Sequence, residues 1–121
     1  MLTSYRELVV WQKAIELALL VYRLSEEFPK REIYGLAAQI RRAAVSIPSN
    51  IAEGYGRGSR KEYVQFLCIA QGSLKEMETQ TILSEKLTYA TSVQTKTVLD
   101  ASEVVGKMLG GLIRSLKAKG Y

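Results

Sequence analysis

Apolar residues recur every three or four positions along the whole chain, and this spacing predicts four helices. The predicted segments are Ser4 to about Glu27, about Ile33 to Gly54, Ser59 to about Leu87, and Thr91 to about Lys117. Ser-x-x-Glu or Thr-x-x-Gln patterns predict a capping box at the start of the first, third and fourth segments. No alternation of apolar and polar residues predicts a strand. Four long helices with short loops predict an all-α, antiparallel up-and-down four-helix bundle, one domain over residues 1–121.

The first predicted helix carries more apolar surface than one bundle face requires. One apolar stripe consists of Val10, Ala14, Leu17, Val21, Leu24 and Phe28. A second consists of Leu8, Trp11, Ile15, Ala18 or Leu19, and Tyr22. The stripes lie roughly 120° apart at 100° per residue and together cover about 220°. Because this is roughly twice the arc of a core-facing surface helix, we expect the bundle to associate with further copies of the chain.

The second predicted helix has a polar row opposite its apolar stripe, and Pro48 lies within it. The row consists of Gln39, Arg42, Ser46, Ser49 or Asn50, and Glu53. Because Pro48 removes the N–H that would bond the carbonyl of Ala44, we expect a kink or a locally rearranged turn. The row could face a ligand, but a structural role beside the proline is the favoured interpretation. The residues assigned to structure or to a subunit interface are Trp11, Arg42, Ser46, Pro48, Asn50 and Glu53.

The chain is basic, with 17 Lys and Arg against 12 Asp and Glu and a net charge of +5. Two local excesses stand out, one from Arg41 to Lys61 and one from Lys107 to the end. In an antiparallel bundle the second and fourth helices run the same way, so both excesses could merge at one end. Such a surface attracts phosphate backbones, although cations at helix ends also complement the helix dipole. The candidate nucleic-acid-binding residues are Arg41, Arg57, Arg60, Lys61, Arg114, Lys117 and Lys119.

Several functional classes are excluded or disfavoured by what the sequence lacks. Without histidine there is no Ser-His-Asp or Cys-His system and no histidine metal ligand, so we expect no enzyme activity, cofactor or metal. The single cysteine, Cys68, has no partner thiol, and we expect it to be a buried apolar residue. Gly54, Gly56 and Gly58 lack the spacing and the preceding strand of a phosphate-binding loop. No signal peptide or membrane span is recognisable, so we expect a cytoplasmic protein with no membrane partner.

Three stretches of the chain closely resemble the 23S ribosomal RNA intervening-sequence protein family. The first is Tyr5 to Ala14, the second is Tyr34-Gly35-Leu36 with Gln39 to Gly54, and the third is Arg57-Gly58-Ser59 with Ala70 to Glu76. The resemblance implies a small four-helix bundle that assembles as a homopentamer. It also implies an architecture similar to the accessory proteins of diversity-generating retroelements, which are basic, pentameric and bind nucleic acid and a reverse transcriptase. It supplies no enzymatic activity and no functional residues.

Two hypotheses follow from the residues and the resemblance together. In the first, a non-enzymatic oligomer binds RNA or DNA through basic surface residues. In the second, the oligomer is an assembly or adaptor protein that docks a protein partner, such as a reverse transcriptase or a ribosomal component, with no direct role in nucleic-acid binding.

Overall fold

The computed structural model describes residues 2–120, which form two short 3-10 helices and four α-helices. The 3-10 helix η1 covers Tyr5–Glu7, and α1 covers Val9–Glu26. The second 3-10 helix, η2, covers Lys30–Glu32 and leads into α2 at Leu36–Tyr55. The two long helices are α3 at Arg60–Lys86 and α4 at Ser92–Ala118. The prediction of an all-α fold with four helices is confirmed, and the described residues contain no strand.

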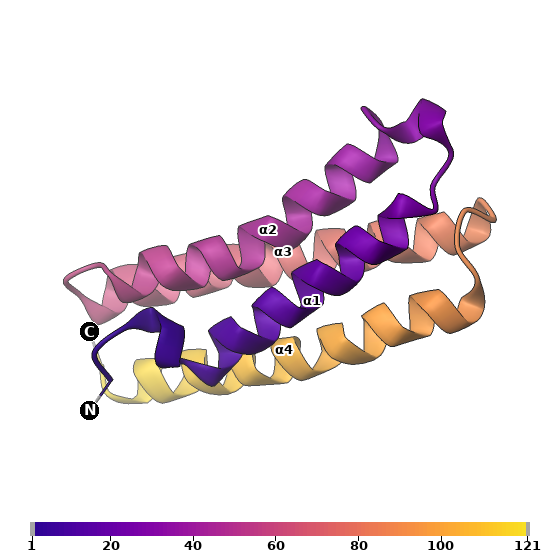
Figure 1. Ribbon diagram of the computed structural model, residues 1–121. Helices are drawn as coiled ribbons and strands as arrows, with labels where there is room; N and C mark the ends of the chain where they lie inside the picture. The colour runs from indigo at the N-terminus through magenta and orange to yellow at the C-terminus, as the bar shows by residue number, and fades with distance from the viewer. Residues whose placement is uncertain (1, 121) are drawn as a thin grey trace.

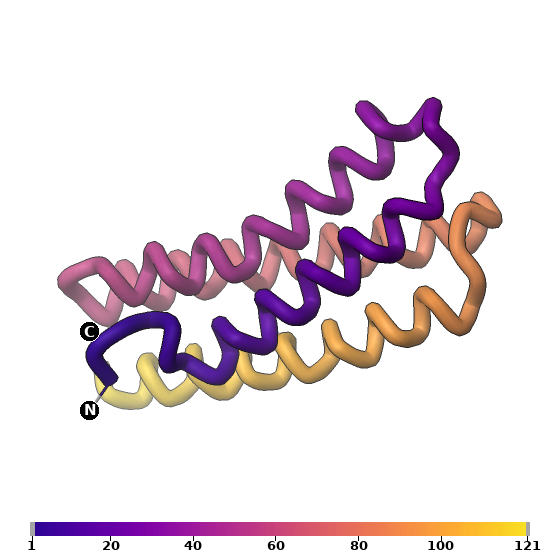
Figure 2. Tube along the Cα trace, viewed as in Figure 1, coloured from indigo at the N-terminus to yellow at the C-terminus, as the bar shows by residue number. Residues whose placement is uncertain are grey.

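Successive helices run antiparallel and enclose a common core (Figure 1). α1 packs on α2 and α4, α3 packs on the same two helices, and the α2–α3 contact is the most extensive. As Figures 1 and 2 show, η1, the α2–α3 turn and the end of α4 lie at one end of the bundle. The η2 segment and the α3–α4 loop lie at the other end. The expectation that the second and fourth helices end at the same place is confirmed.

The core is built from the apolar stripes that the spacing predicts. Leu17 in α1, Ile47 in α2 and Leu67 in α3 are completely buried. Burial of a side chain of this size contributes about 1.5–3 kcal/mol to folding. In α4 the buried positions include Ser102, which is accommodated because its hydroxyl donates to Glu78 at 2.5 Å. Packing of the four stripes, rather than any single contact, therefore fixes the bundle.

The first helix begins differently from the prediction. The hydroxyl of Ser4 accepts a hydrogen bond from the backbone N–H of Arg6 within η1, and the Glu7 carboxylate accepts from Thr3. Leu8 then takes an extended conformation, so α1 starts at its successor. A capping box at Ser4 is therefore wrong, because the turn that it begins stops after three residues.

The other two predicted caps differ in how complete they are. The box from Thr91 to Gln94 is confirmed in both directions. At the start of α3, the Ser59 hydroxyl accepts from the N–H of Glu62 at 3.1 Å, but the Glu62 carboxylate turns toward Arg57. Sequence spacing identifies the cap, but it does not show that a nearby cation will compete for the carboxylate.

Two further expectations concern Pro48 and Cys68. α2 continues through Pro48 as one helix, and Figure 2 shows its axis bending near the middle, as expected from the missing N–H. The expectation that Cys68 is buried is wrong, because its side chain is exposed. Cys68 lies on the side of α3 that borders a groove shared with α4, where Gly72 leaves the surface open.

Candidate functional site

Contacts between helices show which residues lie at the same level, about midway along the bundle, and this level divides it into two halves. The hydroxyl oxygens of Ser46 and Ser73 lie 2.8 Å apart, and a Cβ on Gly106 would lie 3.2 Å from a side-chain carbon of Leu74. Ala18 borders α2 at the same level. We call residues 2–17, 46–73 and 106–120 the terminal half, and residues 18–45 and 74–105 the far half.

The formal charge is distributed unequally between these halves. The terminal half contains nine Lys and Arg against four Glu, whereas the far half contains eight Lys and Arg against eight Asp and Glu. The net side-chain charge of +5 therefore lies entirely in the terminal half. The cations of the terminal half are Arg6, Lys13, Arg57, Arg60, Lys61, Lys107, Arg114, Lys117 and Lys119.

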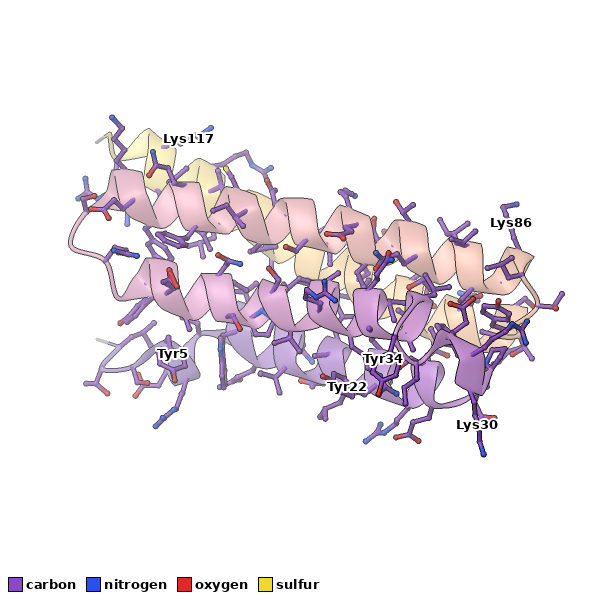
Figure 3. All side chains as sticks on the ribbon, turned by 90° about the horizontal axis from the view of Figure 1, so that it is seen from above. Tyr5, Tyr22, Lys30, Tyr34, Lys86 and Lys117 are labelled. Atoms are coloured by element: carbon purple, nitrogen blue, oxygen red, sulfur yellow. The ribbon has the colours of Figure 1, made fainter. Side chains whose placement is uncertain are left out.

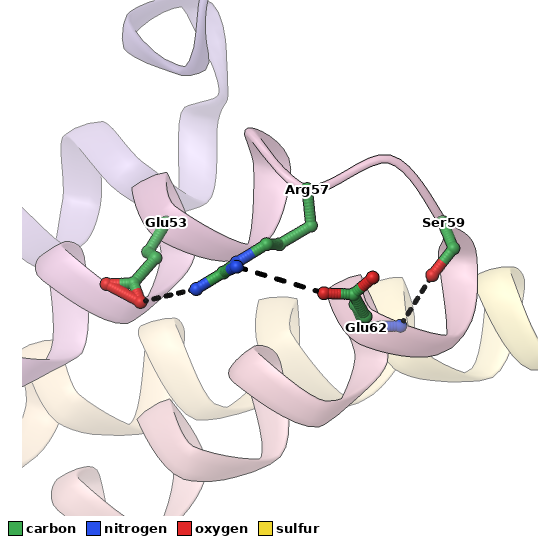
Figure 4. A network of polar contacts seen from close by, with 4 residues as sticks. All are labelled: Glu53, Arg57, Ser59 and Glu62. Carbon is green, nitrogen blue, oxygen red and sulfur yellow. Dashed lines mark hydrogen bonds and ion pairs between the residues drawn. The ribbon is translucent and has the colours of Figure 1, made fainter.

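Arg57, in the turn after α2, is held by contacts within the chain (Figure 4). Its guanidinium lies 3.3 Å from the Glu53 carboxylate and 4.0 Å from that of Glu62. The same group lies over the ring of Phe66, with its central carbon 4.8 Å from the ring centroid. The positive charge of Arg57 is therefore shared with two carboxylates, and its first role is to fix the turn between α2 and α3.

Arg60, in the first turn of α3, ties this helix to the end of α4. Its guanidinium donates to the backbone carbonyls of Lys119 and Gly120, both at 3.2 Å. Carbonyls at a helix C-terminus carry partial negative charge and lack partners within the helix, so a guanidinium there is stabilising. Arg60 brings the two predicted basic segments together.

Six cations of the terminal half have no acidic partner within residues 2–120. Arg6 lies over the ring of Tyr5 and Arg60 is bonded to the end of α4, which leaves four others: Lys61, Arg114, Lys117 and Lys119. All four side chains are exposed. Figure 3 shows Lys117 at the same end as Tyr5, whereas Lys30 and Lys86 lie at the opposite end. These four residues are the cations best placed to meet an anion outside the chain.

Three of these cations share one side of the molecule, which we call the α3–α4 face. A groove of about 780 Å³ lies between the two helices and is lined by Cys68 and Lys107, among others. Lys61 lies two helical turns before Cys68, on the same side of α3. Arg114 lies two turns after Lys107, on the same side of α4. Both therefore lie beyond the groove, toward the end of the bundle that carries the chain termini. Lys117 follows one turn further along α4. The cations therefore extend the groove toward the end of the terminal half.

Arg41 does not belong to this surface. It lies fourteen residues before Tyr55, the last residue of α2, a distance of about 21 Å along the helix axis, and Arg57 follows in the turn beyond that end. Its Nε donates to the Ser25 hydroxyl at 2.6 Å, and its guanidinium lies over the ring of Tyr22 at 4.9 Å. The expectation that the residues from Arg41 to Lys61 form a single cluster is therefore wrong, because one helix carries them to different halves. Arg42 is exposed in the far half as well.

The polar row of α2 forms bonds within the bundle. The side-chain amide of Asn50 donates to the Ser46 carbonyl at 2.7 Å and to the Ser46 hydroxyl at 2.9 Å. The Ser46 hydroxyl also contacts that of Ser73 in α3. The row joins two helices, and the amide of Asn50 does not reach the carbonyl of Ala44 that Pro48 frees. Glu53, at the end of the row, pairs with Arg57.

A second exposed surface, the α1–α2 face, is apolar. A shallow groove of about 270 Å³ runs along it, and its lining contains no charged residue: Tyr5, Trp11, Ile15, Ala18, Val45, Pro48, Ser49 and Ala52. Trp11 packs edge-on against Tyr5 at 5.3 Å. Val45, in the lining, is 42% exposed, and Leu19, one turn after Ile15 on α1, is 51% exposed. Of the second apolar stripe predicted for the first helix, Leu8 and Trp11 pack against the edge of the core, and Leu19 and Tyr22 are exposed. Exposed apolar surface of this kind can mark an interaction site.

These features define the chain as a small helical bundle with one basic half and one apolar side face. The chain belongs to the 23S rRNA-intervening sequence protein family, whose sequence profile matches residues 6–111. The crystal structure of a protein of unknown function from the S23 ribosomal protein family of Bacteroides thetaiotaomicron is similar, with a TM-score of 0.80 and 27% identity. The similarity covers 86% of this chain and 97% of that one. The search of curated proteins found no match.

The helices of residues 2–120 include none that is both long and apolar enough to cross a membrane.

Proposed function

We propose that this protein is a non-enzymatic, self-associating bundle of the cytoplasm that binds the phosphate backbone of RNA or DNA. The observation that carries the proposal is the placement of the whole +5 charge in the terminal half. Lys61, Arg114, Lys117 and Lys119 are exposed there without an acidic partner in the described chain. Phosphate backbones bind such surfaces through the release of condensed counterions and need no base-specific contacts.

Self-association strengthens this proposal because every added subunit adds another basic half. The α1–α2 face is the surface that we assign to it. The face is apolar and uncharged along its groove, and the family resemblance implies a homopentamer. Light scattering on the full chain tests this part, and a monomer of 13.5 kDa at micromolar concentration would contradict it.

A matched pair of variants locates the self-association. Leu19→Glu places a charge on the α1–α2 face, where the leucine is 51% exposed and not needed for the core. Val93→Glu places the same charge at a site that is 75% exposed near the start of α4. We expect the first variant to lower the mass measured by light scattering and the second to leave it unchanged.

Fluorescence anisotropy with a labelled duplex RNA of mixed sequence tests the nucleic-acid part. The double variant Lys61→Glu and Lys117→Glu reverses one cation in the first turn of α3 and one in the last turn of α4. The control, Lys30→Glu and Lys86→Glu, reverses one cation at the start of η2 and one in the last turn of α3, both in the far half. Both double variants change the net charge equally.

We expect the terminal-half variant to bind at least about tenfold more weakly and to reduce the slope of log affinity against log salt by about two. The control should bind like the unaltered protein. Equal loss in both variants would show that overall charge, and not the terminal half, decides binding. An absence of binding at low salt would overturn the nucleic-acid part.

The alternative, an adaptor that docks a protein partner, draws on the same apolar α1–α2 face. The terminal-half variant distinguishes this alternative from the first proposal. The terminal-half variant should lose nucleic acid under the first proposal, whereas under the alternative it should keep a partner protein that co-purifies with the unaltered chain.

A further inference from the structure

The aromatic side chains of the terminal half are already engaged within the chain. Tyr5 and Trp11 pack against each other with ring centroids 5.3 Å apart, and Tyr55 packs against Tyr63 at 6.0 Å. A guanidinium from the α2–α3 turn covers the ring of Phe66. Proteins that hold single-stranded nucleic acid typically stack bases on exposed aromatic rings. The five rings described in this half are not arranged in that way.

Tyr63 is one of these rings, and its contacts lie inside the bundle. Its hydroxyl is buried without a hydrogen-bond partner in the described chain, and its ring lies against Gly54 of α2. Burial, with a smaller effect of Tyr55, raises the pKa of Tyr63 to about 12. This residue serves the α2–α3 contact and offers no platform to a base.

The α3–α4 face, by contrast, has cations but no aromatic residue among those described. The groove is lined by Cys68, Gln71, Gly72, Leu74, Lys75, Glu78, Leu99, Ser102, Glu103, Gly106 and Lys107. Lys75 and Lys107 stand at its edges, each paired with a glutamate of its own helix. Arg114 lies flat along α4, since a Cβ on Gly110 would lie 3.3 Å from its Nη1. This surface can meet phosphates but, among the described residues, has no aromatic ring on which bases could stack.

A duplex presents about twice as much phosphate charge to the cationic row of α4 as a single strand does. Lys107 and Lys117 are ten residues apart on one helix, about 15 Å along its axis. A duplex presents one phosphate charge per about 1.7 Å and so offers about nine charges over that length. A single strand, with half that density, offers about four to the same row.

We infer, on the basis of the proposed function, that the preferred ligand is a nucleic-acid duplex whose phosphate backbones lie across the α3–α4 face of the terminal half. RNA and DNA duplexes share this phosphate chemistry. A single strand lacks both the second backbone and, on this face, the stacking contacts that could replace it.

Competition binding with the intact oligomer tests this inference. A labelled RNA duplex of mixed sequence is displaced by the same duplex unlabelled, by either of its single strands, and by the DNA duplex of the same sequence. We expect each single strand to compete at least about tenfold more weakly than the RNA duplex, at the same salt concentration. A duplex of scrambled sequence should compete equally with the original.

Single strands that compete as well as the duplex would overturn the inference and leave the proposed function in place. No binding of any of these nucleic acids at low salt would overturn both. The DNA duplex shows which of the two duplexes is preferred. If it competes as well as the RNA duplex, phosphate charge alone determines binding. If it competes more weakly, the geometry of the RNA duplex contributes.

A substitution outside the described residues guards against a hidden stacking contact. Tyr121→Ala removes an aromatic ring from the end of the sequence. We expect it to leave the preference for duplex unchanged. If it instead weakens single-strand binding specifically, bases stack after all, and the phosphate-only interpretation is wrong.

Discussion

The terminal half and the far half of this bundle have the same architecture but different net charges, +5 in the first and zero in the second. Both consist of four antiparallel helical segments around a common core. In the far half, cations and acids are equal in number, and several pair along one helix, as Lys96 and Asp100 do at 2.8 Å. In the terminal half, Arg57 and Arg60 are used for the turn and the helix end, whereas Lys61, Arg114, Lys117 and Lys119 have no acidic partner among residues 2–120. The difference shows that net charge alone does not identify a binding surface, because some cations already interact with groups inside the chain.

Substitutions at completely buried sites should have the largest effect on the free energy of unfolding, and they test whether the two halves unfold as one cooperative unit. Ile51→Ala in the terminal half and Ile40→Ala in the far half each empty a completely buried site. Each should lower the free energy of unfolding by about 2–5 kcal/mol. Urea unfolding followed by circular dichroism should show one transition in both variants. If a variant loses only part of its helical circular-dichroism signal in a first transition, the two halves unfold separately.

A smaller effect is expected where α2 and α3 approach closely in the terminal half. A Cβ on Gly54 would lie 2.7 Å from the Cβ of Phe66, which cannot move away freely. Gly54→Ala should therefore cost about 1–3 kcal/mol of stability.

Gly72→Ala is the matched control for this contact. Nothing lies within 4 Å of a Cβ at Gly72, so the substitution should stabilise α3 by about 0.5–1 kcal/mol. Thermal melts of the two variants should thus shift in opposite directions. A loss of stability in both would contradict the open surface described for the groove.

Arg57→Ala tests the internal use of a terminal-half cation. Its ion pair with Glu53 is about half exposed, so the loss should be only about 0.2–1 kcal/mol. Nucleic-acid affinity should change less than it does for Lys117→Ala, because the charge of Arg57 is already shared with two carboxylates. A larger loss of binding for Arg57→Ala would place this residue at the interface.

The smallest expected effect concerns pH and the far half. The Glu32 carboxylate accepts from the N–H of Leu36 at 2.9 Å and from the Tyr89 hydroxyl at 2.7 Å. These two hydrogen bonds, with a smaller contribution from Arg31, lower the pKa of Glu32 below its usual value. The hydrogen bond to Glu32 correspondingly raises the pKa of Tyr89.

Because the folded pKa of Glu32 is the lower one, its contribution to stability is present above the unfolded pKa and is lost as pH falls through the folded pKa. Glu32→Gln should therefore melt below the unaltered protein at neutral pH, and the difference should shrink in acid. A difference that stays constant with pH would mean that the ionised carboxylate is not what holds these loops together.

Much of the fold was predictable because helical spacing reflects burial directly. The stripe from Val10 to Leu24 and the cap at Thr91 are local patterns that the tertiary structure preserves. The start of α1 was not predictable in this way, since Ser4 begins a turn that Leu8 stops by taking an extended conformation.

The candidate site was predicted in part. The meeting of the α2–α3 turn with the end of α4 followed from topology, and the bonds from Arg60 to the carbonyls of α4 confirm it. Sequence proximity misplaced Arg41, because a helix separates residues that are close in number. The exposure of Cys68 depends on the groove beside Gly72, which is a property of two helices together.

If nucleic acid covers the α3–α4 face of the terminal half, as we propose, it should shield the thiol of Cys68 from a reagent in solution. This exposed, single cysteine lines the groove beside Lys107. Its rate of alkylation by the neutral reagent N-ethylmaleimide is measured with and without a saturating RNA duplex. A control protein carries Cys68→Ala and Val93→Cys, which moves the thiol to an exposed site in the far half.

Bound duplex should slow alkylation of Cys68 several-fold, and high salt should restore the rate. The thiol in the control protein should react equally fast throughout. An unchanged rate at Cys68 while anisotropy shows the duplex bound, or protection of the control thiol instead, would contradict this proposal.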